Sequence, residues 1–206
     1  MRRISEPTVR RLSLYLRFLE EHAARGIATI SSDELAGCGA TTAAQVRKDL
    51  SLFGSFGKRG LGYAVPELAA RLRDILGLER TYGVAVVGAG KVGSALVQYG
   101  GFASRGFLVR WVYDIDPARI GHAWNGVRVA DARNMETDFH EGGPDIAIVA
   151  TPGDAAQSVA DRLVRLGVKA ILNFAPVHLV VPDGVVVKNV NMAIELEALS
   201  YALRHG

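Results

Sequence analysis

The sequence has few of the residues that mark secreted, membrane or metal-binding proteins. It contains one cysteine, Cys38, which excludes a disulfide framework within the chain and a cysteine-rich zinc site. Its five histidines are scattered without the spacing of metal ligands. Its apolar runs are far shorter than the roughly 20 residues that cross a bilayer, and its first residues lack the apolar core of a signal peptide. We therefore expect a cytoplasmic protein with no metal and no membrane contact.

Charge is distributed unevenly along the 206 residues. Residues 1–80 contain 13 Lys and Arg against 9 Asp and Glu, a net charge of +4, whereas residues 81–206 contain 11 against 12, a net charge of −1. The length allows a small domain followed by a medium one. A basic first part permits contact with phosphate groups, although such an excess is often only a solvated surface.

Three short helices are predicted in the basic part, over about residues 7–25, 31–37 and 42–53. The first has apolar residues at helical spacing from Val9 to Leu19. The second begins at Ser31 and is predicted to have a capping box with the acid three residues later. A linker helix after Pro66 is expected to end this domain.

The second and third helices are joined by a short glycine-containing turn, which is the layout of a helix-turn-helix. In that motif, the N-terminal part of the second helix enters the major groove of DNA. Thr42 and Gln45 are also expected to form a capping box. The candidates for contact with base edges and phosphates are Thr41, Thr42, Gln45, Arg47 and Lys48. A small three-helix domain with a solvated basic face is the alternative.

A glycine-rich stretch, SLFGSFGKRGLGY, covers residues 51–63. It is predicted to form two short strands around a tight turn, with Lys58 and Arg59 at the tip. A hairpin beside a helix-turn-helix makes a winged helix, and an arginine at the wing tip can enter a narrow minor groove. Lys58 and Arg59 are therefore DNA-binding candidates, and a structural hairpin with incidental charge is the alternative.

The stretch VVGAGKVG, residues 86–93, has the glycine spacing of a dinucleotide-binding loop. That spacing alone is weak evidence, but a strand before it and a helix after it supply the required context. Gly88 allows a tight turn, Gly90 lets the backbone approach a pyrophosphate, and Gly93 lets the helix pack on the strand. A degenerate nucleotide fold is the alternative.

Strands and helices alternate through the rest of the chain, which predicts a doubly wound, mostly parallel sheet. Ligands bind at the carboxyl edge of such a sheet, where VATPGD and NFAP follow two strands. The cofactor-binding candidates are Gly88, Ala89, Gly90, Lys91, Val92, Gly93, Asp114, Thr151, Pro152, Asn173 and Phe174.

Asp114 follows the second strand of this sheet and lies 21 residues after Gly93. At that offset an acid accepts hydrogen bonds from a ribose diol and repels a 2′-phosphate. NAD is therefore preferred to NADP, although the nearby Arg119 leaves NADP open.

Residues 81–206 leave no room for a catalytic domain beside the sheet and its helices. A dehydrogenase needs a proton donor or acceptor beside the hydride site and a place for its substrate. Lys169 and His178 are near the expected edge, but a surface or core role explains each of them more simply. We therefore expect that this protein is not an enzyme.

Several stretches together resemble the Rex family of bacterial redox-sensing transcriptional repressors: SSDELAGCGATTAAQVRKDLSLFGSFGKRGLGY, VVGAGKVGSAL, YDID, LNFAP and NVNMAIELEALSYAL. The resemblance implies a homodimer that binds operator DNA through two winged helices, with NADH and NAD⁺ as the sensed ligands. NADH would release the DNA. It also implies a C-terminal helix exchanged between subunits, which agrees with an apolar stripe at Met192, Leu196, Leu199 and Leu203. Packing of that helix within its own chain is the alternative.

The expected fold is therefore α/β: a winged helix-turn-helix domain with its linker helix over residues 1–78, a doubly wound (Rossmann) domain over 79–190 and an exchanged helix over 191–206. Two other functions stay open. One is a small NAD-dependent oxidoreductase with an accessory helical domain, and the other is a repressor that senses coenzyme A or another nucleotide.

The resemblance also implies a hydrogen-bonding switch close to the nicotinamide, formed by Arg17 on the first helix, Tyr99 on the first Rossmann helix and Asn191. The family has a carboxylate at the position of Asn191. An amide cannot form an ion pair, and charge-assisted hydrogen bonds are roughly twice as strong as neutral ones. We therefore predict a weaker or differently connected switch in this chain.

Overall fold

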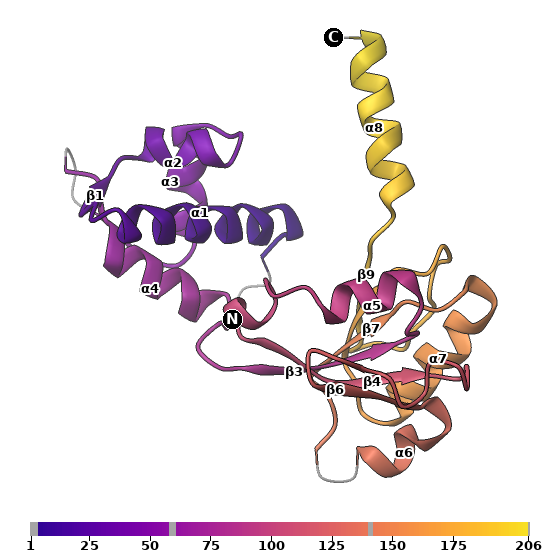
Figure 1. The fold of residues 1–206 in the computed structure, drawn as a ribbon. Coiled ribbons are helices and arrows are strands. Elements are labelled where there is room, and N and C mark those ends of the chain that lie inside the picture. Colours follow the sequence, from indigo (N-terminus) through magenta and orange to yellow (C-terminus); the bar gives the residue numbers. More distant parts are fainter. Residues whose placement is uncertain (1–3, 58–60, 140–141, 206) are drawn as a thin grey trace. The chain divides into compact units, whose positions relative to one another are not determined.

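The computed structural model describes residues 4–57, 61–139 and 142–205, and Figure 1 shows their helices and strands. Contacts divide the chain into two compact units, Met1–Arg80 and Thr81–Gly206. This division falls after Arg80, close to the boundary expected after residue 78, and it assigns the C-terminal helix to the second unit.

The described part of the first unit contains four α-helices, and side-chain caps explain the starts of the first three, whereas α4 has a proline in its first turn. The hydroxyl of Ser5 accepts a hydrogen bond from the Thr8 amide before α1. The predicted capping box of Ser31 and Glu34 is confirmed at the start of α2. The helices are α1 (Glu6–Ala24), α2 (Ser32–Cys38), α3 (Ala43–Ser51) and α4 (Val65–Ile75).

The start of α3 differs from the prediction. Thr42 caps the helix, because its hydroxyl accepts a hydrogen bond from the Gln45 amide at 3.2 Å. The side chain of Gln45 does not return to the cap; instead it donates to Asp49 at 2.8 Å. The predicted capping box is wrong. It requires the side-chain oxygen of Gln45 to accept from the Thr42 amide, whereas the bond from the Gln45 amide nitrogen to Asp49 holds this side chain elsewhere.

The glycine-rich stretch after α3 is also arranged differently. Residues 52–57 contain no strand, so the prediction of two strands within residues 51–63 is corrected for the described part of this stretch. Strand β2 (Tyr63–Ala64) pairs antiparallel with β1 (Thr29–Ile30), which lies between α1 and α2. Ile30 is buried in the core of the unit, which keeps β1 in place as the partner.

The core of the first unit is built around α1. Leu12, Leu16 and Leu19 are buried as predicted, whereas Val9 is 36% exposed and Tyr15, which was not predicted, is buried as well. Tyr15 belongs to the inner face together with Leu12, Leu16 and Leu19 because positions three and four apart lie on one side of a helix.

The described part of the second unit contains a seven-stranded sheet with the order β5-β6-β4-β3-β7-β8-β9. All neighbouring strands are parallel except β5, which pairs antiparallel with β6. The strand order reverses between β3 and β7, as in doubly wound dinucleotide-binding sheets. The strands are β3 (Tyr82–Val87), β4 (Phe107–Asp114), β5 (Ala123–Trp124), β6 (Val127–Asp131), β7 (Ile146–Val149), β8 (Ala170–Asn173) and β9 (Val186–Asn189).

The helices of this unit cover the two faces of the central strand. Ala85 and Val87 of β3 belong to one hydrophobic cluster, which includes α7 (Gly153–Arg165), and Val84 and Val86 belong to another, which includes the end of α5 (Lys91–Val97). A continuous apolar strand is expected when both faces are covered. The short helix α6 (Met135–Asp138) and strand β5 were not predicted.

The last helix, α8 (Met192–His205), is drawn in yellow in Figure 1 and has no buried residue. Its predicted apolar stripe is exposed, and Leu203 reaches 89% exposure.

Candidate functional site

The helix-turn-helix of the first unit is formed by α2 and α3. The turn between them contains Ala40 in a left-handed conformation, with φ of 44°. Arg47, Lys48 and Thr42 are exposed on α3 and at its start, and Thr41 is half-buried. These predicted DNA-binding residues therefore remain accessible to a ligand.

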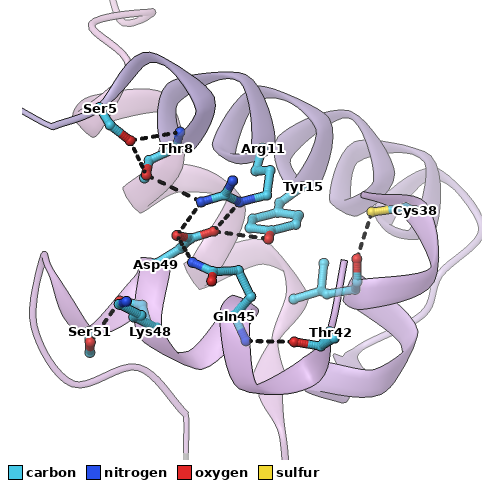
Figure 2. Close-up of polar contacts among 11 residues, drawn as sticks. Ser5, Thr8, Arg11, Tyr15, Cys38, Thr42, Gln45, Lys48, Asp49 and Ser51 are labelled. Carbon is cyan, nitrogen blue, oxygen red and sulfur yellow. Dashed lines mark hydrogen bonds and ion pairs between the residues drawn. The ribbon is translucent and has the colours of Figure 1, made fainter. Parts of the chain in front are cut away.

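Gln45 differs from them because its side chain belongs to a polar cluster between α1 and α3, which Figure 2 shows. Asp49 lies at the centre of this cluster and is buried. Its Oδ2 accepts from Arg11 Nε at 2.6 Å and from the Tyr15 hydroxyl at 3.2 Å. Its Oδ1 accepts from Arg11 Nη2 at 2.7 Å and from Gln45 Nε2 at 2.8 Å. The carboxylate thus joins the two helices through a bidentate ion pair and two further hydrogen bonds.

This cluster changes the acidity of its members. Burial opposes ionisation of Asp49, but the hydrogen bonds from Arg11, Gln45 and Tyr15 outweigh it and lower the pKa of that carboxyl. Burial and the neighbouring Asp49 charge raise the pKa of Tyr15 to about 12. Asp49 is therefore ionised and Tyr15 remains a hydrogen-bond donor at neutral pH.

The predicted wing residues Lys58 and Arg59 lie outside the described residues. The described glycines on either side of them pack closely against backbone. A Cβ on Gly57 would lie 2.5 Å from the Gly62 carbonyl oxygen, and a Cβ on Gly62 would lie 2.3 Å from the Ile30 carbonyl oxygen. Both residues have φ of 76°, so only glycine suits these positions.

The glycine loop of the second unit follows β3 as predicted. A Cβ on Gly88 would lie 2.5 Å from the Ala150 carbonyl oxygen, and one on Gly93 would lie 1.8 Å from the Gly88 carbonyl oxygen. Of the residues that the structure describes, only Arg119 would lie near a Cβ on Gly90, with its Nη1 at 3.8 Å. Gly88 and Gly93 therefore allow close internal packing, whereas Gly90 leaves open space above the loop.

A pocket of about 570 Å³ opens beside this loop at the carboxyl ends of β3, β4 and β7. The hydroxyl of Thr151 is buried and has no hydrogen-bond partner among the described residues. Because buried polar atoms are almost always bonded, this hydroxyl suits a polar atom of a ligand. The lining residues include Gly90, Lys91, Asp114, Arg119, Thr151 and Phe174.

Asp114 is buried at the end of β4, and its carboxylate is already occupied. Oδ2 accepts from the Ala89 amide at 2.7 Å and from Arg119 Nη1 at 3.0 Å. Oδ1 accepts from the amides of Ile115 and Asp116, each at 2.8 Å. Burial opposes ionisation, but these bonds prevail and lower the pKa of Asp114. Asp114 holds the glycine loop, and Arg119 offsets part of the charge that would repel a 2′-phosphate.

Asn173 ends β8 and is fully buried. Its Nδ2 donates to the Val177 carbonyl at 2.8 Å and to Asn189 Oδ1 at 2.9 Å, while its Oδ1 accepts from the Ala175 amide at 3.0 Å. The side chain thus fixes the loop after β8, which brings Phe174 to the pocket. As a cofactor-binding residue, Asn173 remains a prediction, and it would act through this loop.

These features fit a dinucleotide. The loop has open space at Gly90 for a phosphate, the pocket carries cationic Lys91 and Arg119, and the Thr151 hydroxyl lacks a partner in the described part of the chain. Within the described residues, no group of three or more His, Cys, Asp or Glu could hold a metal ion. In the same part of the chain, no helix is both long and apolar enough to span a bilayer.

Two family models match the chain, one in each unit. "Putative DNA-binding protein N-terminus" matches residues 3–51, and "CoA binding domain" matches residues 79–177. The redox-sensing transcriptional repressor Rex of Carboxydothermus hydrogenoformans is 47% identical over 98% of this chain and 97% of its own length. This chain belongs to the Rex family. Rex of Streptomyces coelicolor is 46% identical over 97% of this chain and 78% of its own length.

Solved Rex structures have the same fold. The crystal structure of RSP, a Rex-family repressor, in complex with β-NAD⁺ and operator DNA matches with a TM-score of 0.92 and 42% identity, covering 98% of this chain and 94% of that chain. The structure of RSP in complex with β-NADH matches with a TM-score of 0.89 and 40% identity, covering 98% and 95%. The resemblance to Rex and the expected fold class are thereby confirmed.

The three predicted Rex switch residues are exposed side chains. Arg17 is on α1. Tyr99 lies just after the end of α5 rather than on it, because the helix ends at Val97; its ring packs against Phe102 with centroids 5.0 Å apart. Asn191 caps α8, since its Oδ1 accepts from the Ala193 amide at 3.0 Å.

The prediction missed Arg11, Tyr15 and Asp49. A pattern in the sequence could have indicated Asp49, because it lies between Val46 and Leu50 on the apolar face of α3, where an acid requires a partner. The partner itself is 38 residues away, so only the packing of α1 against α3 identifies Arg11.

Proposed function

We propose that this Rex-family protein is a homodimeric transcriptional repressor of the cytoplasm that binds operator DNA and senses the NADH/NAD⁺ ratio. NADH binding to the second unit releases the DNA. The observation that carries this proposal is that one chain joins an exposed recognition helix to a dinucleotide-type pocket. RSP, which has been crystallised with β-NAD⁺ and operator DNA, resembles it over nearly the full length.

In the DNA-binding half, α3 enters the major groove, and Arg47 and Lys48 contact phosphates and base edges. Both side chains are exposed, and the first part of the chain carries the positive net charge. Lys58 and Arg59 contribute the contacts of the wing.

In the ligand-binding half, the loop from Gly88 to Gly93 holds the pyrophosphate through its backbone N–H groups. Asp114 keeps that loop in place and lies beside the adenosine ribose. Thr151 and Phe174, near the ends of β7 and β8, line the remainder of the pocket. The nicotinamide ring differs in charge between the oxidised and reduced forms, so side chains close to the ring can bind the two forms with different affinity.

The switch must bind the reduced cofactor more tightly in the DNA-free arrangement, because a ligand shifts an equilibrium only through its differential affinity. Arg17, Tyr99 and Asn191 are the residues proposed for this task. Asn191 offers a neutral amide where the family has a carboxylate, so its hydrogen bond to Arg17 or Tyr99 is weaker.

The C-terminal helix supports the homodimer. Large exposed apolar surfaces are rare on monomers, and they mark interaction sites. Met192, Leu196, Leu199 and Leu203 share one side of α8, and Ile194 and Tyr201 lie on the opposite side at helical spacing. A helix that is apolar on two opposite sides suits a place between two surfaces, as an exchanged helix would have.

The proposal excludes catalysis. Lys169 and His178 are exposed, and neither lines the pocket beside the glycine loop. Among the described residues that line this pocket, none is a histidine or a tyrosine. The one lysine is Lys91, which belongs to the glycine loop and not to the ends of β7 and β8.

The test is a titration of DNA at one fixed salt concentration, since affinities for DNA depend steeply on salt. The probe is a duplex that the protein enriches from a randomised pool. NADH should weaken binding at least about fivefold, the lower end of typical allosteric couplings, whereas NAD⁺ should not. Equal affinity with and without NADH would refute the sensing function.

Coenzyme A is the second candidate ligand, favoured by the match of residues 79–177 to the coenzyme A family model. The same titration with coenzyme A, and with NADPH, decides between the ligands. If coenzyme A releases the DNA and NADH does not, coenzyme A is the sensed ligand, and the proposed DNA binding is unaffected.

A further inference from the structure

We propose that Asp49 is a positioning residue of the DNA interface. It does not touch DNA, but it holds the recognition helix α3 and the Gln45 side chain in the orientation that distinguishes the operator from other DNA. This inference rests on the proposed function, and it extends that function by assigning operator selectivity to a residue inside the domain.

The first support is the way in which α3 is anchored. The buried residues of this nine-residue helix are Val46, Asp49 and Leu50. The two apolar side chains give attraction without a preferred direction. The bidentate pair of Asp49 and Arg11 has a fixed fork geometry, so it sets how far α3 is rotated about its own axis relative to α1.

The size of the effect follows from helix dimensions. The side-chain surface of a helix lies about 5 to 6 Å from its axis, so a rotation of about 20° moves surface atoms by roughly 2 Å. Hydrogen bonds to base edges tolerate only about 0.5 Å in donor–acceptor distance. Arg47 and Lys48 project from the exposed face of this helix, and loss of the anchor is therefore sufficient to disturb their contacts with bases.

The second support is the direct bond between Asp49 and Gln45. An ionised carboxylate only accepts hydrogen bonds, so the amide nitrogen of Gln45 must face Asp49, as Figure 2 shows. The carbonyl oxygen of Gln45 is then directed away from the carboxylate, and one N–H of the amide is left for another acceptor. Asp49 itself is 1% exposed, which places it behind Gln45 rather than at the DNA.

The cluster extends towards the start of α1, which reinforces the anchor. Arg11 Nη2 also donates to the Thr8 hydroxyl at 3.3 Å, and that hydroxyl is 2.9 Å from the hydroxyl of Ser5, the cap of α1. A buried polar network in which each oxygen of Asp49 accepts two hydrogen bonds specifies one arrangement of its members. The same two helices are thus held by directional bonds from the cap of α1 to the middle of α3.

The experiment measures the affinity of the full-length protein for two duplexes: one enriched by the wild type from a randomised pool, and a shuffled duplex of the same composition. Asp49→Asn keeps the side-chain shape but replaces one acceptor oxygen by an NH₂ group, which cannot accept the hydrogen bonds that Arg11 and Gln45 donate. We expect operator affinity to fall about tenfold, a loss of the size of one base contact, with non-specific affinity within about twofold of the wild type. Melting followed by circular dichroism verifies that each variant is folded at the assay temperature.

Glu20→Gln is the matched control, because Glu20 of α1 forms an ion pair with Arg73 in the same unit, and this pair joins α1 to α4 rather than to α3. It should leave the ratio of operator to non-specific affinity unchanged. Arg11→Lys keeps the positive charge but cannot form the bidentate pair with Asp49, so it should lower this ratio as Asp49→Asn does. This second variant decides the question if Asp49→Asn does not fold.

A double-mutant cycle tests the route through Gln45. Gln45→Ala should cost less operator affinity in the Asp49→Asn background than in the wild type, because Asp49 no longer orients the amide. If the wild type prefers the operator and Asp49→Asn or Arg11→Lys has the same ratio of operator to non-specific affinity, the inference is wrong and the proposed function stands. A wild type that shows no preference between the duplexes overturns the proposed function and this inference together.

Discussion

Gly93 and Gly90 of the glycine loop differ in the space around them. Substituting each by alanine should therefore separate an effect on folding from an effect on ligand binding. A methyl group on Gly93 would lie 1.8 Å from the Gly88 carbonyl oxygen, a backbone atom. A normal contact of about 3.5 Å then requires the loop and α5 to separate by about 1.7 Å. Such overpacking costs about 1 to 3 kcal/mol or more, and Gly93→Ala should lower the melting temperature of the second unit.

NADH binding should also fail in Gly93→Ala. A shift of this size removes loop N–H groups from hydrogen-bond distance of the pyrophosphate, and bonds to charged groups contribute about 1.5 to 3 kcal/mol each. Loss of one to two such bonds weakens NADH affinity about 100-fold.

Gly90→Ala should behave differently. Among the described residues, the added methyl group meets only Arg119 Nη1, at 3.8 Å, and the φ of −71° suits alanine. Folding should lose at most about 1 kcal/mol, because alanine is a poorer helix cap than glycine. The methyl group nevertheless occupies the open space above the loop, so NADH affinity should fall at least about tenfold, the equivalent of a lost charged hydrogen bond.

Calorimetric titration with NADH and thermal melting of the same samples measure both quantities. Gly37→Ala is the control, since a methyl group there meets no described residue within 4 Å. If Gly90→Ala binds NADH as the wild type does, the loop does not hold the pyrophosphate as argued. If Gly93→Ala melts at the wild-type temperature, the packing argument is wrong.

Other expectations concern the switch, the DNA contact and the buried ion pair. Asn191→Asp keeps the cap on α8 and adds a charge, so DNA titrations should show a larger NADH-dependent loss of affinity; equal coupling in both proteins would remove this position from the switch. Lys48→Ala should weaken DNA binding and reduce the slope of log affinity against log salt by about 1, with NADH affinity unchanged, and an unaltered slope would argue against a phosphate contact. Because the pKa of Asp49 is lowered in the folded state, its pair with Arg11 stabilises the protein above about pH 4, the ordinary pKa of an aspartate, and this contribution declines as the pH falls through the folded-state pKa. Urea unfolding should therefore show a cost of about 3 to 5 kcal/mol for Arg11→Met at pH 7 and a smaller cost at pH 3, whereas a cost independent of pH would contradict the ion pair.

Local patterns predicted most of the elements in this chain. The capping box of Ser31 and Glu34 and the glycine loop after β3 depend on residues close together in the sequence, so their chemistry could be read directly. The parallel sheet followed from alternating strand and helix patterns, because a parallel connection needs a long crossover. The resemblance to the Rex family supplied what these patterns could not, the hypothesis that the chain is a DNA-binding redox sensor whose last helix is exchanged between subunits.

Pairings between distant residues could not be predicted, because they depend on which surfaces meet when the chain folds. The strand partner of β2 lies before α2, and the amide of Gln45 is directed to Asp49 rather than to its own helix cap. Asp114 was recognised by its offset from the glycines, but only the folded chain shows its carboxylate bound to the Ala89 amide.

The sequence by itself thus determined most of the elements, the order of the two units and the residues of the glycine loop, since propensity, capping and spacing act over a few residues. The tertiary structure alone decided how those residues are used. It buried the charge of Asp49 against Arg11, 38 residues away, and it left the hydroxyl of Thr151, beside the glycine loop, without a partner among the residues that the structure describes. Burial and hydrogen bonding depend on the surroundings of an atom, which exist only after distant segments have packed together.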